Sequence, residues 1–571
     1  MSKSVWTSPP TLLSVDKATE GRRLSPDFFI TRLPVELITQ VVRHIKSSDL
    51  ANFALTNKDC RQFARWRQFA KVTLLFPKSI GLTHVLLQEL VNRSLNHGQS
   101  TFPCIGPCIR QAFIWSPDID DYEQDGENAF LYVSTLKQIL STPSVVPQLH
   151  AIYWETEGEL RAPESLELNF LCANQLKIQH LAVKGTLNDL NFRASRGCDW
   201  NLTSLWFAED SARDIFNARF LEPGNQNILA LASPTLVSLT MECPNISTLI
   251  NDIGYTPSFP ALRDFKMIDI DETELPVIED ILKSSRKLRL FESSPGTVSP
   301  FGQILDVSEH FELSGNFPEL ETFIWRTHNL ETPYQPVPAV SFLLANPQIR
   351  TLSIPIPVEL AWLENRLLPA LGHSFIHLKS LHLSWPSPVP TDALVHISGL
   401  TNLEQICLAG KGNHRDRWTW NCNYYALLDH FRPLQKLRFI ALVQDAGLQG
   451  TGQPHPYQDR WDSNTVSAWQ KTHNRFIRLL LQDYAAVLPN LERAFMGQLD
   501  MRIKRLRDNA SVEKLGEYDV DEMDVFWLKI IFGRWHNPES DTLRTSFSHS
   551  ELRQQWDSDF LPECFFTLDS M

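Results

Sequence analysis

The sequence predicts an α/β chain, in which a short module of three helices is followed by a long, irregular solenoid whose strands form a parallel sheet. Three observations lead to this prediction. Apolar residues at three-to-four-residue spacing indicate a helix close to residue 40. A short apolar frame recurs from Leu149 onward, and helical patterns separate its copies. Strand, turn and helix in repeated succession are typical of a solenoid, in which each unit packs only on its neighbours.

Composition sets the broad class. The chain has 571 residues, of which 43% are hydrophobic and 21% charged, so we do not expect it to be disordered throughout. The formal net charge is −13 and no long basic run occurs, so we expect no nucleic acid as a partner. The densest basic cluster, at residues 502–507, is expected to be a solvated helix face. No run approaches the roughly 18 apolar residues of a membrane span, so no membrane contact is expected.

The first 28 residues or so are polar and contain Pro9 and Pro10. They lack the apolar core of a secretory signal, so we expect residues 1–28 to be a disordered arm and the protein to be cytoplasmic or nuclear. The nine Cys are thinly spread, which does not indicate a disulfide scaffold.

Residues 29–75 are expected to form the helical module. Pro34 suits the first turn of a helix, and the apolar residues that follow it share one helix face. These residues are Leu37, Ile38, Val41, Val42 and Ile45. The polar residues 47–49 end this helix and can cap the next, whose apolar stripe spans residues 50–55. A third segment begins at Asn57.

The run LPVELITQVVRHIKSSDLANFALTNKDCRQFA resembles the F-box. The pattern of that family is Leu-Pro-x-Glu, an apolar helix, then Asp-Leu, and an apolar turn that leads to a basic residue. The resemblance implies docking on the SKP adaptor of cullin-RING ubiquitin ligases, and through it on a cullin scaffold. The residues that it assigns to adaptor binding are Leu33, Pro34, Leu37, Ile38, Val41, Ile45, Asp49, Leu50, Leu55 and Lys58.

Two positions differ from the family's pattern. It often has Cys immediately before the basic residue and Trp two residues after it, where this chain has Asn57 and Cys60. On the residues alone, an unrelated helical hairpin is the alternative.

A frame of the form apolar-x-x-apolar-x-apolar recurs through residues 149–500, where we expect the solenoid. Its last three positions alternate, which places both apolar side chains on one face of a strand. Successive copies start mostly 24 to 34 residues apart. The copies begin at Leu149, Ile178, Leu202, Leu236, Leu262, Leu320, Ile349, Leu378, Leu403, Leu437 and Leu491, with Leu288 as a further candidate.

Helical patterns lie between these copies. They cover residues 275–288, 358–371, 392–400, 424–431 and 466–488. The succession resembles the degenerate leucine-rich repeats that commonly follow an F-box, although the copies vary in length and nearly all lack the Asn that follows the strand in that family. An irregular α/β fold with several buried apolar strands is the alternative.

Two flanking segments complete the expected domain plan. Residues 76–148 would connect the helical module to the solenoid and supply an N-terminal cap. Residues 501–571 are first charged and then aromatic, and we expect them to form a C-terminal cap and tail. The reason is that a terminal repeat needs a cover for its open apolar end.

The sequence shows no constellation of catalytic or metal-binding residues. Cys104 and Cys108 are not followed by a second pair of ligands at zinc-finger spacing. Gly410, Lys411 and Gly412 lack the rest of a phosphate-binding loop. Neither a Gly-x-Ser-x-Gly elbow nor a His-Glu-x-x-His helix occurs. We therefore expect no catalytic residues, no metal and no cofactor, and a protein that is not an enzyme.

The positions between the apolar ones lie on the other face of each strand. In a solenoid these side chains share one face, which is either a contact surface or an ordinary solvated sheet. Their mixture of aromatic, basic and acidic types is typical of interfaces. The residues expected to contact a target protein are Trp206, Lys266, Ile324, Arg326 and His382.

With the resemblance, the sequence predicts the substrate-recognition subunit of a cullin-RING (SKP-cullin-F-box) E3 ubiquitin ligase. The F-box would dock on the SKP adaptor, and the solenoid would bind an unidentified target protein. One alternative is an interaction scaffold that does not lead to degradation. A second is an enzyme with a dispersed site on a repeat-like fold.

Overall fold

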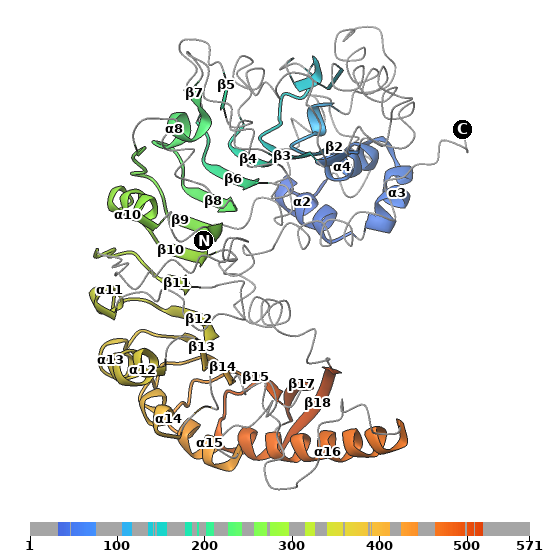
Figure 1. Ribbon diagram of the computed structural model, residues 1–571. Helices are drawn as coiled ribbons and strands as arrows, with labels where there is room; N and C mark the ends of the chain where they lie inside the picture. Colours follow the sequence, from blue (N-terminus) through green and yellow to red (C-terminus); the bar gives the residue numbers. More distant parts are fainter. Residues whose placement is uncertain are drawn as a thin grey trace. The chain divides into compact units, whose positions relative to one another are not determined.

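The computed structural model describes two series of helices and strands (Figure 1). The predicted N-terminal arm, residues 1–28, lies outside the residues that it describes. The described residues are 32–45, 47–75, 106–116, 135–136, 138–140, 142, 145–156, 178–185, 191–192, 201–209, 226–242, 256–270, 275–295, 315–325, 340–357, 360–385, 389, 391–410, 424–443, 463–496, 499–506 and 509–517.

The chain divides into two compact units. The N-terminal unit comprises residues 1–243, 247–259 and 545–571. The C-terminal unit comprises residues 244–246 and 260–544.

Three helices open the N-terminal unit, as the sequence predicts. They are α2 (Val35–His44), α3 (Ser47–Thr56) and α4 (Lys58–Gln68). Pro34 stands at the N-cap of α2, where its missing N–H removes no helical hydrogen bond, because the first N–H groups of a helix have no partner within it. Asn57 stands at the N-cap of α4, and its side chain accepts a hydrogen bond from the backbone N–H of Cys60.

Parallel strands follow the helices in the N-terminal unit and pair in chain order. They are β1 (Lys71–Leu75), β2 (Gln111–Ser116), β3 (Ala151–Thr156), β4 (His180–Gly185), β6 (Ser204–Glu209) and β8 (Ser238–Glu242). Shorter elements are η2 (Gly106–Cys108), β5 (Asn191–Phe192), β7 (Gln226–Asn227) and α8 (Ile228–Ala232). Leu205 and Leu239 lie in register on β6 and β8, and both are buried.

The strands begin earlier than residue 149, where the sequence places the first copy of the frame. β1 and β2 carry the frame as well, with Val72 and Leu74 on β1 and Ala112 and Ile114 on β2. Strand β2 therefore lies within the segment 76–148 that was expected to be a connector and cap.

The C-terminal unit continues the alternation of strand and helix. Its parallel strands are β9 (Asp264–Ile270), β10 (Leu290–Pro295), β11 (Thr322–Trp325), β12 (Thr351–Pro357), β13 (Ser380–Trp385), β14 (Gln405–Gly410), β15 (Phe439–Val443) and β16 (Arg493–Met496). Its helices are α10 (Leu275–Ser284), α11 (Val340–Ala345), α12 (Leu360–Trp362), the π-helical turn η7 (Leu363–Leu367), α13 (Leu368–Ser374), α14 (Thr391–Ser398), α15 (Tyr424–Phe431) and α16 (Ser463–Val487). Figure 1 shows α10 to α15 along one face of the strands of this unit.

These strands confirm the predicted frame and give the chain the expected α/β, solenoid-like architecture. In the C-terminal unit, Phe323, Leu352, Leu381 and Ile406 occupy successive strands in one register, and none has any exposed surface. The helical patterns of the sequence correspond to α10, α12 to α13, α14, α15 and α16.

A tight turn precedes several strands, and the sequence places Pro318 just before the frame at Leu320 and Pro489 with Asn490 just before the frame at Leu491. The backbone N–H of Leu320 donates to the carbonyl oxygen of Phe317 (2.9 Å), and that of Leu491 donates to Leu488 (3.1 Å). Pro318 is the second residue of its turn, a position that suits its fixed φ angle.

The parallel strands end in an antiparallel hairpin. β17 (Leu499–Leu506) pairs antiparallel with β16 and with β18 (Asn509–Glu517). The basic cluster at 502–507 was expected on a helix, but Arg502 and Lys504 lie on β17. They are exposed and alternate with the buried Met501 and Ile503, which is the period of a strand.

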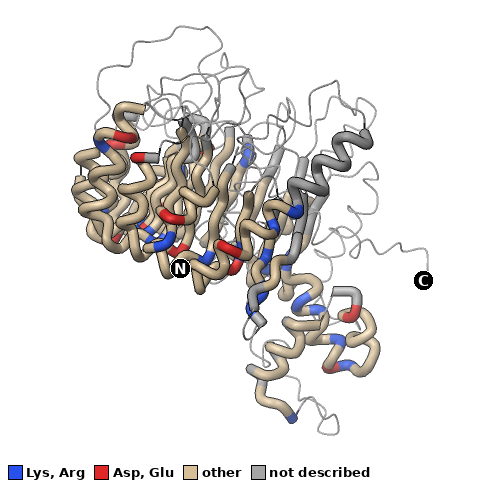
Figure 2. The backbone as a smooth tube through the Cα atoms, turned by 90° about the horizontal axis from the view of Figure 1, so that it is seen from below, with Lys and Arg blue, Asp and Glu red and all other residues tan. Residues whose placement is uncertain are grey.

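Charges of both signs are interspersed along the backbone (Figure 2). Ion pairs join neighbouring strands of the C-terminal unit just before each strand begins. They are Arg289–Glu321 (3.0 Å), Lys379–Glu404 (2.6 Å) and Arg438–Glu492 (2.7 Å). These pairs are partly exposed, so each contributes little to stability.

Candidate functional site

Helix α2 and the turn before it present large apolar side chains to the outside. Leu33, Leu37 and Val41 are 37%, 45% and 42% exposed. Leu37 and Val41 are four residues apart and lie on one side of the helix, and Leu33 precedes its first turn. Ile38 and Val42 lie on another side and are 2% and 1% exposed. The helix is therefore apolar on its buried side and also on part of its outer side.

Helix α3 and the start of α4 extend this outer surface. Leu55, near the end of α3, is 74% exposed, and it is the most exposed of the large apolar side chains in the part of the chain that the structure describes. Asp49 and Lys58 are exposed as well, and so is Pro34. Leu50, by contrast, turns inward and is 5% exposed.

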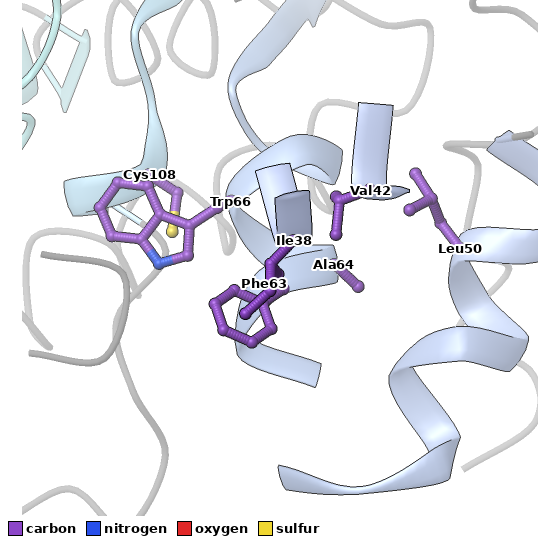
Figure 3. Packing of buried hydrophobic residues seen from close by; sticks show 7 residues of the cluster. All are labelled: Ile38, Val42, Leu50, Phe63, Ala64, Trp66 and Cys108. Atoms are coloured by element: carbon purple, nitrogen blue, oxygen red, sulfur yellow. The ribbon is translucent and has the colours of Figure 1, made fainter. Parts of the chain in front are cut away.

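A small core holds the three helices in place (Figure 3). The buried residues of this core are Ile38, Val42, Leu50, Phe63, Ala64, Trp66 and Cys108. Because Cys108 belongs to η2, the core also reaches the segment that leads into strand β2. Ile45 and Phe53 pack against it and are partly buried.

Arg67 joins helix α4 to the end of helix α2. Its Nη1 donates hydrogen bonds to the carbonyl oxygens of Val42 and Ile45. The last carbonyl groups of a helix have no partner within it, so this guanidinium satisfies them and brings a positive charge to the negative end of the helix dipole. Burial lowers the pKa of Arg67 from its ordinary value. Sequence reasoning missed this residue, because a basic residue in the last turn of a helix is common.

The end of α4 is also tied to the first strands of the sheet. The carbonyl oxygen of Ala70 accepts hydrogen bonds from the backbone N–H groups of Arg110 and Gln111, both at 3.0 Å. The guanidinium of Arg110 lies over the ring of Trp66, 5.9 Å from its centroid. The helices and the start of the sheet therefore pack together within the N-terminal unit.

The comparison with known families identifies these helices. Residues 30–71 match the family model of the F-box domain. The chain carries an F-box domain. F-box domains are protein-interaction modules that bind the SKP adaptor of SKP-cullin-F-box ubiquitin ligases. No curated protein matches the chain.

The structure divides the ten predicted adaptor-binding residues of the F-box into two groups. Exposed side chains are Leu33, Pro34, Leu37, Val41, Asp49, Leu55 and Lys58. Ile45 is half-buried, and Ile38 and Leu50 belong to the core. The exposed group can meet a partner directly, whereas the buried pair can act only by holding the helices together. Contact with the adaptor stays a prediction for all of them.

The predicted target-contacting residues lie differently from what the sequence suggested. Trp206, Lys266, Ile324 and His382 are 9%, 3%, 0% and 4% exposed, and Arg326 lies outside the described residues. This corrects the expectation that these side chains are open to a partner. Side chains on the second face of a parallel sheet are commonly covered as well as those on the first.

In the N-terminal unit, this second face carries stacked aromatic rings. Phe113 stacks on Tyr153 with ring centroids 4.3 Å apart, and Tyr153 stacks on Trp206 at 5.7 Å. Trp206 Nε1 donates a hydrogen bond to Glu242 Oε1 (3.2 Å). Phe113 and Glu242 are half-buried, so the row that runs from Phe113 through Tyr153 and Trp206 to the Glu242 carboxylate reaches the surface at both ends.

In the C-terminal unit, the second face carries buried polar side chains. Lys266 Nζ lies 3.5 Å from Glu292 Oε2, and both side chains are almost fully buried. Ser353 Oγ and His382 Nδ1 are 3.2 Å apart. Both of these residues are also buried, at 6% and 4% exposed, so this Ser–His contact gives a substrate little access.

Within the described residues, no group of three or more His, Cys, Asp and Glu side chains is placed to hold a metal ion. Among the same residues, no helix has the length and hydropathy needed to cross a membrane.

Proposed function

We propose that this chain is the substrate-recognition subunit of an SKP-cullin-F-box E3 ubiquitin ligase. The observation that carries the proposal is the exposed apolar row of the F-box, which consists of Leu33, Leu37 and Val41 with Leu55 on the next helix. Large apolar side chains gathered on so small a module indicate a surface that another protein covers. Asp49 and Lys58 would form part of a polar rim around that contact.

The free energy gained by burying these apolar side chains is large enough for a docking surface. Complete burial of a large aliphatic side chain stabilises by roughly 1.5–3 kcal/mol. The side chains of the row are already partly buried in the chain, so each contributes less than this when the adaptor binds. Several of them together, however, provide enough free energy that the loss of one or two weakens the complex severely.

The proposed role of the repeat region is to capture a target protein. Within the predicted set, Trp206 is the best candidate for a contact, because the row of side chains in which it lies has the half-buried Phe113 at one end and the half-buried Glu242 at the other. The chain itself performs no bond-making chemistry in this proposal. It raises the concentration of the target beside the ubiquitin donor of the ligase.

The docking surface is tested by charge substitution. We expect that Leu37→Asp with Val41→Asp abolishes co-purification with the SKP adaptor, because two carboxylates would have to be desolvated without a partner. The matched control is Ile376→Asp with Val395→Asp, which alters apolar residues of the C-terminal unit that are 65% and 56% exposed. Adaptor capture at wild-type yield by the first variant would refute the docking surface.

A second experiment distinguishes the function of a ligase subunit from that of an interaction scaffold that does not lead to degradation. Proteins captured by the wild-type chain are quantified in cells with the cullin ligase active and with it inhibited. A captured target that accumulates on inhibition supports the ligase role. If the captured proteins keep the same abundance in both conditions, the scaffold is the better description.

A further inference from the structure

A buried arginine lies where the F-box meets the sheet of the N-terminal unit. Arg110 precedes strand β2 and is 4% exposed. Its backbone is fully engaged, because its N–H donates to Ala70 and its carbonyl oxygen accepts from His150 and Ala151. Its guanidinium carbon lies over the ring of Trp66 of helix α4, 5.9 Å from the ring centroid. The position of this side chain is therefore fixed from both sides of the junction.

Two donors of this guanidinium have no partner. Its Nε and Nη2 atoms are buried and make no hydrogen bond. These two nitrogens lie on the same edge of the guanidinium plane, and their N–H groups point in parallel. The contact with Trp66 involves no hydrogen bond, so it does not supply an acceptor for this edge. Such an edge is the geometry with which Arg binds two oxygens of a carboxylate or phosphate group.

Two histidines and the thiol of Cys108 are the titratable groups that lie near Arg110. His150 stands before strand β3, next to Arg110, and His180 begins strand β4. The two imidazole rings meet edge to face, with centroids 6.1 Å apart. His180 Nδ1 is also buried without a hydrogen-bond partner. Burial lowers the pKa of His180 to about 4 and that of Arg110 to about 10.

A buried guanidinium with two unused donors is unfavourable unless an anion completes it. None of the ion pairs among the described residues involves Arg110, His150 or His180. Both atoms are closed to solvent, so a bound anion would be enclosed by the chain, which favours a small anion over a side chain of another protein. The net charge of the whole chain is −13, so the chain as a whole does not attract anions. Binding of an anion must therefore come from the local groups at Arg110.

We propose that a small oxyanion of the phosphate class binds the Nε and Nη2 edge of Arg110, beside His150 and His180, and joins the F-box to the sheet. The anion supplies the acceptors that the buried edge lacks. Because Arg110 also lies over the ring of Trp66, binding of the anion stabilises the contact between helix α4 and strand β2. This site is separate from the outer face of the F-box, and its existence does not depend on adaptor docking.

The probe is inorganic phosphate, titrated into the purified full-length chain by calorimetry in chloride buffer of constant ionic strength. We expect one phosphate per chain, and a rise in the thermal unfolding temperature as phosphate replaces chloride. Arg110→Met should weaken phosphate binding at least about tenfold and abolish the rise, because both charged donors are lost. Absence of phosphate binding by the wild-type chain overturns the proposal.

Two further variants make the test specific. Arg110→Lys keeps the charge but not the parallel pair of donors, so we expect weakened binding from it even if Arg110→Met fails to fold. Arg350→Met removes an exposed arginine of the C-terminal unit and should leave phosphate binding unchanged. Wild-type affinity in Arg110→Lys, or a loss in Arg350→Met equal to that in Arg110→Met, would show that the Arg110 edge is not the site.

Discussion

The side-chain oxygen of Asn57 accepts a 2.7 Å hydrogen bond from the backbone N–H of Cys60, in the first turn of helix α4. These are the two positions at which the chain differs from the usual F-box pattern. Asn is one of the preferred N-cap residues, and Cys60 has no exposed surface. Burial raises the pKa of the Cys60 thiol, which keeps it neutral. The two differences therefore support each other within one helical turn.

Removing this cap should loosen helix α4. Asn57→Ala leaves the N–H of Cys60 without its acceptor, and we expect a loss of about 1 kcal/mol. Hydrogen exchange of the amides of α4 in the full-length chain measures it. Asn57→Ser is the control, because serine also caps helices and should retain most of the protection. Equal exchange in all three proteins would mean that the cap contributes nothing.

Arg67 should matter to the F-box through the helix that it caps. Arg67→Met removes the donor to the carbonyl oxygens of Val42 and Ile45. We expect the loss of these hydrogen bonds to a charged group to destabilise the F-box by roughly 1–3 kcal/mol. We expect faster hydrogen exchange at the end of α2 and weaker adaptor binding. Arg61→Met, which changes an exposed arginine on the same helix, is the control. If both variants bind the adaptor equally, capping by Arg67 is not needed for docking.

The strands and helices of the repeat region could be predicted because their signal is local. In each copy, two apolar residues separated by one other residue must face the same way, and this fixes both the strand and its buried side. The frame also occurs in β1 and β2, but Val72 and Ala112 are smaller than the Leu or Ile common in later copies, so these two strands were missed.

Asn346 should be important to the C-terminal unit, although it is polar. It has no exposed surface, its Oδ1 accepts from Phe317 (2.7 Å), and its Nδ2 donates to the carbonyl oxygens of Gly315 and Phe342. Gly315 has a φ of 141°, which other residues rarely adopt, so this side chain holds a loop that few sequences can form.

Asn346→Ala leaves one buried donor and two carbonyl acceptors unpaired, at roughly 1–3 kcal/mol for each unsatisfied group. We expect a clear fall in the thermal unfolding temperature of the full-length chain. Asn402→Ala is the control, because Asn402 Nδ2 makes a comparable bond to the carbonyl oxygen of the exposed Ile376, and Asn402 is only half-buried. A similar change in the two variants would contradict the structural role of Asn346.

His180 should make the protein less stable in acid. Its folded pKa of about 4 lies below the ordinary value of 6.5, chiefly because of burial and then because of His150. Between these two values, His180 is protonated in the unfolded chain but neutral in the folded chain. The free energy of unfolding therefore falls as pH drops from about 6.5 towards 4. His180→Gln cannot gain this proton, so its unfolding free energy should fall less over that range than that of the wild type. Parallel pH curves would show that His180 does not contribute.

The second face of the sheet could not be predicted in the same way as the frame. Alternation correctly places Trp206, Lys266 and His382 opposite the frame residues, but it does not say whether that face is covered. Coverage depends on segments far away in the sequence. The polar types at these positions suggested solvent, whereas in the structure many of them are buried with polar partners.

The buried pair of Lys266 and Glu292 tests this last point. Their side chains are 4% and 2% exposed, so neither charge is solvated if its partner is removed. Lys266→Met alone should destabilise the chain by roughly 3–5 kcal/mol, because it removes the opposite charge that lies 3.5 Å from a buried carboxylate. Lys266→Met with Glu292→Leu should recover much of that loss, because no buried charge remains. The exposed pair of Lys379 and Glu404 is the matched control, and Lys379→Met should cost at most about 1 kcal/mol. Thermal unfolding of the wild type, of Lys266→Met, of the double variant and of Lys379→Met measures these differences in stability. If the double variant is no more stable than Lys266→Met, the burial of this face does not depend on charge pairing, and other contacts must hold it.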